Sequence, residues 1–159
     1  MSTTAVVEAW VEEPLKRFVD DARVRLALLL HPSGQVMAQY GFTRAIDVMS
    51  ACALAAAIHA SAAELGKQLE GRPFSGLHHA GRERQIFLAE ARTARGAFVF
   101  LTVFDQASSL GLVNLYFAEF RQHLADAAPE PDATEAAPAL AANFERDLNR
   151  NLAVLFGRA

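Results

Sequence analysis

The chain has 159 residues, of which 52% are hydrophobic and 21% are charged, and its formal net charge is -3 at neutral pH. This length and composition suit one globular domain with a substantial apolar core, and they exclude a disordered chain. The slightly acidic balance argues against nucleic-acid binding, which needs clustered lysine and arginine. The chain also begins without the charged-then-apolar pattern of a secretory signal, so we expect a cytoplasmic protein.

Two features of the apolar stretches bear on the cellular environment. The single cysteine, Cys52, lies in an apolar stretch and is expected to be a small buried side chain, since no intrachain disulfide is possible. The most apolar stretch, residues 48–63, is interrupted by Ser50, His59 and Ser61. It is short and alanine-rich for a membrane span, so we predict no membrane-spanning segment.

The first elements predicted along the chain are a helix and a hairpin. Apolar residues at spacings of three and four predict a helix over residues 5–21, and Pro14 is expected to kink this helix or to start a second helical piece. Residues 24–30 form a nearly continuous apolar run of strand length, and residues 35–40 form a second strand. Pro32 and Gly34 between them occupy positions that a tight turn prefers, which makes the two strands a hairpin.

A long helix follows the hairpin. Alanine dominates residues 44–69, proline is absent, and Gly66 is the only glycine. Thr43 is a plausible N-cap for this helix. Residues 71–73 (Gly-Arg-Pro) are expected to end it.

The second half of the domain predicts three strands and a helix. The strands are expected over residues 74–80, 84–91 and 97–104, with short turns between them. The helix is expected over residues 109–125, where apolar side chains recur along one side.

These elements predict a fold of the α/β type in which helices cover both faces of one sheet, an α+β sandwich. A five-stranded antiparallel sheet would lie between the long helix on one face and two helices on the other. Residues 24–30 and 97–104 are apolar on both faces and should be central strands. The polar strand 74–80 should lie at the edge, where an unprotected strand invites pairing with a second copy of the chain.

The end of the chain carries a separate helical segment beyond the predicted domain, which spans residues 5–125. Residues 126–138 are acidic and contain prolines, which predicts a flexible linker. Residues 139–157 are then expected to form a C-terminal helix. Its docking stripe would consist of Phe144, Leu148, Leu152 and Phe156. A one-sided stripe after a linker favours docking in a groove of a partner, with packing on its own domain or disorder as the alternatives.

No constellation of residues points to catalysis within this chain. The sequence has no phosphate-binding loop, no Gly-x-Ser-x-Gly elbow and no His-Glu-x-x-His motif. The adjacent pair His78 and His79 would point to opposite faces of a strand and could not readily bind one ion together. His59 is expected to be a packed or interfacial histidine rather than a general base. We therefore expect no metal and no cofactor, and we expect the chain to act on a partner rather than as an enzyme.

The two sides of the long helix differ in side-chain size. The large residues Leu54, Ile58, Leu65 and Leu69 share one side and are predicted to pack on the sheet. Nearly opposite lies a set of smaller residues: Cys52, Ala56, His59, Ala60 and Ala63. Small residues let another backbone approach closely, so this side is interpreted as a helix–helix seam in a homodimer or a docking face for a partner. An ordinary exposed alanine-rich face is the alternative.

Several motifs, in this order and spacing, resemble the roadblock/LC7 domain family, and within it the bacterial MglB proteins. The strongest match is residues 103–105 (Val-Phe-Asp) followed by residues 109–113 (Ser-Leu-Gly-Leu-Val). Residues 31–34 match the polar turn with a closing glycine, and residues 74–81 resemble a Phe-x4-His-x-Gly segment. The C-terminal helix ends in Leu-Phe and resembles the extension of MglB.

The resemblance implies a homodimer with a continuous sheet and the long helices side by side. MglB-like dimers bind the GTP form of MglA, a small Ras-like GTPase of bacterial cell polarity and gliding motility. They stimulate GTP hydrolysis without an arginine finger, by reshaping the switch region of the GTPase. The resemblance would place this contact on the small-residue side of the long helix and on the C-terminal extension.

The sequence departs from the family at two points. The long helix reads Ala-Ala-Ile at residues 56–58, where MglB-like chains often read Ala-Gly-Asn, and Ala80 replaces an acidic residue. These departures leave a second hypothesis, a non-catalytic roadblock scaffold that links a GTPase or polarity proteins without speeding hydrolysis. A sensor of the related profilin, PAS or GAF type would instead need a ligand cavity.

Overall fold

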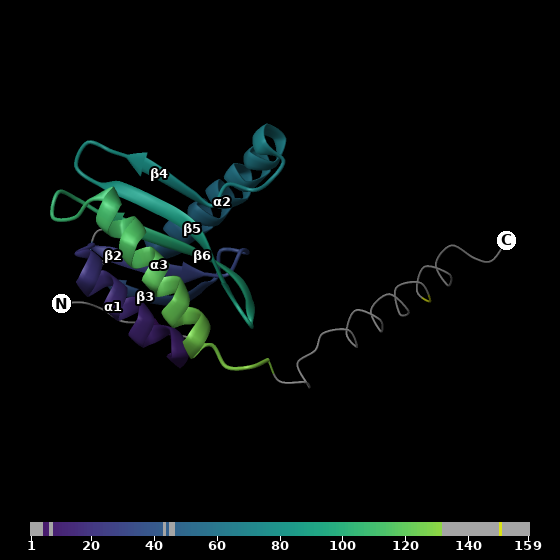
Figure 1. Ribbon diagram of the computed structural model, residues 1–159, viewed down its shortest axis with the longest axis horizontal. Helices are drawn as coiled ribbons and strands as arrows, with labels where there is room; N and C mark the ends of the chain where they lie inside the picture. The colour runs from purple at the N-terminus through teal and green to yellow at the C-terminus, as the bar shows by residue number, and fades with distance from the viewer. Residues whose placement is uncertain (1–4, 7, 43, 45–46, 132–149, 151–159) are drawn as a thin grey trace. The chain divides into compact units, whose positions relative to one another are not determined.

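The computed structural model describes residues 5–6, 8–42, 44, 47–131 and 150 (Figure 1). The chain divides into a compact unit, Met1–Pro129, and a second unit, Glu130–Ala159, of which only residues 130, 131 and 150 are described. The fold below is that of the first unit.

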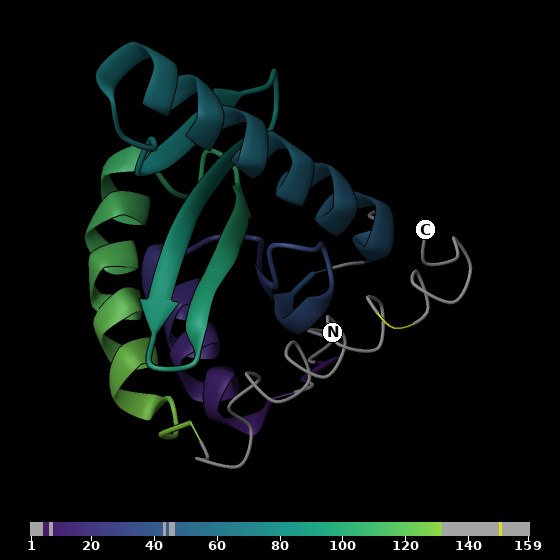
Figure 2. The same ribbon diagram turned by 90° about the vertical axis from the view of Figure 1, so that its right-hand side faces the viewer.

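The described part of the first unit is a sheet covered by helices on both faces. In chain order the elements are β1 (Ala5–Val6), a 3-10 turn (Ala9–Val11), α1 (Glu12–Ala22), β2 (Leu26–Leu30), β3 (Val36–Gly41), α2 (Val48–Glu70), β4 (Gly76–Ala80), β5 (Gln85–Thr93), β6 (Gly96–Phe104) and α3 (Leu110–Ala127). Helix α2 covers one face, and α1 and α3 cover the other (Figures 1 and 2). This arrangement confirms the predicted sandwich.

The strands are ordered β1-β3-β2-β6-β5-β4, and every neighbouring pair is antiparallel. The two apolar strands, β2 and β6, lie at the centre as predicted, and all five residues of β2 are buried. Strand β4 lies at one edge, also as predicted, and most of its residues are exposed. The hydrophobic patterns of these strands therefore predicted their positions in the sheet correctly.

The predicted start of the first helix is wrong. Residues 5–6 form a short strand that pairs with β3, which gives the sheet a sixth strand, and α1 begins at Glu12. Pro14 explains the difference, because proline is tolerated in the first turn of a helix and disrupts a helix interior. Pro14 therefore lies in the first turn of α1, where a helix that begins at Glu12 can accommodate it.

The predicted start of the long helix is also wrong. Helix α2 begins at Val48, with Asp47 as its N-cap, whose side chain accepts a hydrogen bond from the Ser50 backbone N–H at 3.2 Å. A hydrogen bond from the Ser50 hydroxyl and, second, this backbone bond hold the pKa of Asp47 below its usual value. The expected cap, Thr43, lies outside the described residues. The C-terminal end is as predicted, because Gly71 adopts the left-handed conformation (φ 74°) that ends helices.

The last helix of the domain is longer than expected. Ser109 is its N-cap and accepts a hydrogen bond from the Leu112 N–H at 3.2 Å. Helix α3 ends at Ala127, so the first two residues of the predicted linker are helical.

The face of the sheet under α1 and α3 is packed with aromatic rings. Phe100 of β6 lies at its centre, with ring centroids 4.9 Å from Phe18, 4.9 Å from Phe120 and 5.0 Å from Phe117. All four residues are buried. Edge-to-face and offset contacts at this distance are favourable beyond their burial, so this cluster anchors the domain.

The face under α2 is built differently. The sheet itself supplies the large buried side chains of this layer: Leu26, Leu28, Leu30, Leu88, Val99 and Leu101. The helix contributes the small residues Cys52, Ala55 and Ala56. A helix that packs through small side chains lies close to the sheet.

Candidate interaction surface

The side of α2 that faces the sheet carries its smallest residues. Cys52, Ala55, Ala56 and Gly66 are the buried residues of the helix. The β2–β3 turn also comes close to α2, since a Cβ added at Gly34 would lie 3.4 Å from the Ala53 Cα. The small residues of α2 therefore let the chain's own sheet and β2–β3 hairpin lie close to the helix backbone.

The opposite side of α2 carries a stripe of large apolar residues, which we call the outer stripe. Its members are Leu54, Ile58, Leu65 and Leu69, with 64%, 36%, 51% and 69% of their surface exposed. The prediction that these residues pack on the sheet is wrong. The physical reason is that the leucines of β2 and the large residues of β5 and β6 already fill this layer, which leaves space for small helix residues only.

The residues of the predicted small-residue seam differ in their exposure. Cys52 and Ala56 are buried against the sheet, and burial raises the pKa of the Cys52 thiol. His59 and Ala63 are half-buried, and Ala60 is exposed. Cys52 and Ala56 cannot contact another protein from this position, so only the exposed part of the predicted seam is open to a partner.

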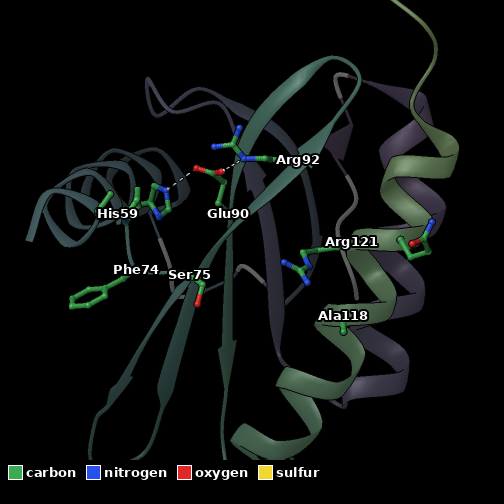
Figure 3. Close-up of a pocket in the computed structure, with 10 residues that line it drawn as sticks. His59, Phe74, Ser75, Glu90, Arg92, Ala118 and Arg121 are labelled. Carbon is green, nitrogen blue, oxygen red and sulfur yellow. Dashed lines mark ion pairs between the residues drawn. The ribbon is translucent and has the colours of Figure 1, made fainter. Parts of the chain in front are cut away.

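His59 lies at the margin of the layer beneath α2 and faces a strand. Its Nε2 atom is 3.8 Å from a carboxylate oxygen of Glu90 on β5, and the Arg92 Nε atom is 2.5 Å from the other Glu90 oxygen (Figure 3). These three side chains form one wall of a cavity of about 520 Å³. His59 is thus a packed residue at a charged cluster, as the sequence indicated.

The free edge of the sheet is β4. The Gly81 N–H donates to the Arg84 carbonyl at 2.8 Å, which makes residues 81 and 84 a hydrogen-bonded pair of the β4–β5 hairpin. Because hydrogen-bonded pairs alternate in an antiparallel ladder, the backbone groups of Gly76, His78 and Ala80 point outward. An added strand could bind to these groups.

The described part of the chain shows no metal-binding arrangement. The His78 ring is 6.0 Å from Phe104 on the α3 side and its Nε2 is 2.7 Å from the Gln85 Oε1, while His79 alternates to the α2 side. Within the described ranges, no three His, Cys, Asp or Glu residues are grouped to bind an ion. The predicted docking residues of the C-terminal helix, Phe144, Leu148, Leu152 and Phe156, lie outside those ranges.

Helix α2 is long and apolar enough to cross a membrane by length and composition alone, and few residues of its apolar window are buried. The helix nevertheless packs on the sheet through one side and carries the charged residues Glu64, Lys67 and Glu70 in its last turns. An apolar side left open by a folded domain is typical of a protein–protein contact.

Comparisons with known proteins identify the fold. No protein-family model matches the sequence, and no curated protein matches it. Among solved structures, MglB of Myxococcus xanthus is 24% identical with a TM-score of 0.68, and the match covers 76% of this chain and 95% of that one. The gliding protein MglB from Thermus thermophilus is 25% identical with a TM-score of 0.67, covering 79% and 96%. A roadblock/LC7 domain from Streptomyces avermitilis is 16% identical with a TM-score of 0.57, covering 69% and 89%.

These likenesses confirm the roadblock/LC7 fold that the sequence motifs indicated and the similarity to MglB structures within it.

Proposed function

We propose that this chain is a homodimeric regulator of a small Ras-like GTPase, similar to MglA, in bacterial cell polarity or motility. It would bind the GTP form in the cytoplasm and stimulate hydrolysis without an arginine finger. The observation that carries the proposal is the outer stripe, a row of large exposed apolar residues on the central helix of an MglB-like fold.

Burying the outer stripe against another protein would release a favourable free energy, which is the physical argument for a protein contact. Fully burying one leucine or isoleucine side chain contributes about 1.5–3 kcal/mol, and four such residues lie along one side of α2. The open edge of β4 offers backbone groups for strand pairing. We propose that a second copy of the chain covers both.

The proposed mechanism places the chemistry in the GTPase. Phosphoryl transfer needs a positioned water, a metal ion and stabilised charge, and a GTPase supplies most of these from its own switch segments. A regulator can therefore act by stabilising the active arrangement of those segments. The bound dimer would contact the switch segments and stabilise their active arrangement.

A non-catalytic scaffold is the second candidate, and the position of the two departures favours it. Ile58 belongs to the outer stripe, and Ala80 lies at the end of the edge strand, so both changes fall on the surface that we propose for the second copy. A dimer that is altered there can still bind the GTPase without presenting the surface that stimulates hydrolysis.

The test is multiple-turnover GTP hydrolysis by an MglA-like GTPase, with and without this protein. Leu65→Glu places a charge in the outer stripe, and Gln68→Glu places the same charge at an exposed polar position on the same helix. Stimulation by the wild type and by Gln68→Glu, with loss in Leu65→Glu, is the expected result. Binding without stimulation would select the scaffold, and the absence of both would contradict the proposal.

The C-terminal segment remains a separate proposal. Residues 126–138 would act as a linker, and a helix over residues 139–157 would dock through its apolar stripe on the GTPase. Removing residues 139–159 should weaken GTPase binding without changing the melting temperature of the domain. Unchanged binding would contradict this role.

A further inference from the structure

The sheet has a second open edge, next to the cavity in Figure 3. Strand β4 has five residues and pairs only with Gln85–Ala89 of the nine-residue strand β5. The chain before β4 turns away toward the end of α2, so no strand in the described part of the chain neighbours residues 90–93 of β5 on that side. The cavity occupies the space that a continuing strand would fill.

The backbone at this edge is oriented for pairing. The hydrogen bond between residues 81 and 84 fixes which residues of β5 bond to which neighbour. The backbone groups of the even-numbered residues 86 and 88 bond to β4, and those of the odd-numbered residues of β5 bond to β6. The N–H and C=O groups of Glu90 and Arg92 therefore point toward the cavity. No described backbone group pairs with them there.

Besides the wall formed by His59, Glu90 and Arg92, the cavity has a basic side and an apolar side. On one side Arg121 extends from α3 into the open space (Figure 3). Its guanidinium lies 5.5 Å from the centre of the Phe117 ring, and no described carboxylate forms an ion pair with it. On the other side Ala63 and the half-buried Phe74 form an apolar wall. The carboxylate of Glu90 is already held by Arg92, so it leaves the Arg121 charge uncompensated.

We propose that this edge binds an extended segment of another protein by strand addition along residues 90–93. The segment would alternate acidic and apolar residues, because successive side chains of a strand point to opposite sides. The acidic side chain would pair with Arg121, and its neighbours would pack on Phe74 and Ala63. Charge complementarity to Arg121 identifies the occupant as acidic. The site goes beyond the proposed GTPase contact and does not depend on it.

The first test measures the charge preference. The probe is the fluorescein-labelled peptide Thr-Glu-Val-Glu-Val-Thr, capped at both ends, and binding is followed by fluorescence anisotropy against the full-length protein. The matched probe carries lysine in place of glutamate. The wild type should bind the acidic probe at least about tenfold more tightly, the loss expected when one hydrogen bond to a charged group is removed. Equal binding of the two probes, or no binding of the acidic probe, would overturn the proposal.

A charge swap assigns the preference to one residue. Arg121→Glu should reverse the order of binding and bind the lysine probe more tightly than the glutamate probe, because the lysine probe then meets the complementary charge. The control is Arg17→Glu on α1, which adds the same charge change away from the cavity and should leave the order unchanged. Thermal melting checks that both variants remain folded. An unchanged order in folded Arg121→Glu would overturn the assignment.

The second test isolates the strand pairing. Methylating the backbone nitrogen of one central residue at a time, either the second glutamate or the valine before it, keeps the side chains and removes one N–H donor. Because alternate residues of the added strand face β5, one of the two methylated probes should bind about tenfold or more weakly. If both bind as the parent probe does, strand addition is wrong.

Discussion

The two faces of the sheet are covered in opposite ways. Under α1 and α3, large rings from the helices and the strands interlock around Phe100. Under α2, the strands supply the large side chains and the helix supplies alanine, cysteine and glycine. The first face thus uses the large residues of its helices for folding, whereas the second leaves the large residues of α2 exposed, and we propose that they serve association.

The largest effect is expected at the centre of the aromatic face. Phe100→Ala should lower the free energy of unfolding by about 3–5 kcal/mol, because it removes a fully buried ring and leaves a cavity between three others. Leu115→Ala is the control, since Leu115 is an exposed leucine of α3 and its loss should cost at most about 0.5 kcal/mol. Urea unfolding measures both. Similar costs for the two variants would contradict the packing described.

A smaller effect is expected where α2 meets the segment before β4. A Cβ at Gly66 would lie 2.5 Å from the Phe74 backbone nitrogen and 2.9 Å from the Arg72 carbonyl oxygen. Alanine is favoured over glycine inside a helix by about 1 kcal/mol, but overpacking against backbone costs about 1–3 kcal/mol. Gly66→Ala should therefore destabilise the protein or displace residues 72–74.

Ser61→Ala is the matched change on the exposed side of the same helix. It should leave the urea midpoint nearly unchanged. A Gly66→Ala variant that is more stable than the wild type would show that the segment does not pack as described.

The smallest effect concerns an ion pair outside both faces. The Arg25 Nε atom donates to Asp105 at 2.6 Å, and the Ala107 backbone N–H donates to the same carboxylate at 2.9 Å. The Ala107 bond first, and Arg25 second, hold the pKa of Asp105 below its usual value. Because the folded pKa is depressed, the stabilisation is present above the unfolded pKa, about 3.9, and is lost as the pH falls through the folded value.

Asp105→Asn should therefore cost about 0.2–1 kcal/mol at pH 7, since the pair is exposed and screened by solvent. The difference from the wild type should shrink between pH 7 and about pH 2, because the wild-type carboxylate takes up its proton as the pH falls through its lowered folded pKa. Urea unfolding at the two pH values measures it. A cost that is equal at both pH values would show that the charge of Asp105 has no part in the effect.

The sequence predicted the strand order better than the helix faces. Strands 24–30 and 97–104 are apolar at nearly every position, and only a central strand satisfies that pattern, so their place followed from composition alone. Both faces of α2 are apolar, and periodicity alone could not say which one meets the sheet. Which face of α2 meets the sheet depends on large side chains from strands that are distant in the sequence. These side chains already fill the space between α2 and the sheet.

Two further features depend on tertiary geometry. The sixth strand, Ala5–Val6, is recruited by the free edge of β3 and carries no pattern of its own. The cavity beside β5 arises because β4 is four residues shorter than its neighbour, and no local motif records that difference. Arg121 could have been noticed only as a basic residue on a helix facing the strands.

The proposed association through α2 is tested most directly by the molar mass of the protein in solution, measured by light scattering for the wild type, Leu65→Glu and Gln68→Glu. We predict a wild-type mass of twice the 17.2 kDa of one chain, a lower mass for Leu65→Glu, and an unchanged dimer for Gln68→Glu. A wild-type protein that remains a monomer at high concentration, or a Leu65→Glu variant that remains a dimer, would contradict the claim that the outer stripe of α2 is the association surface.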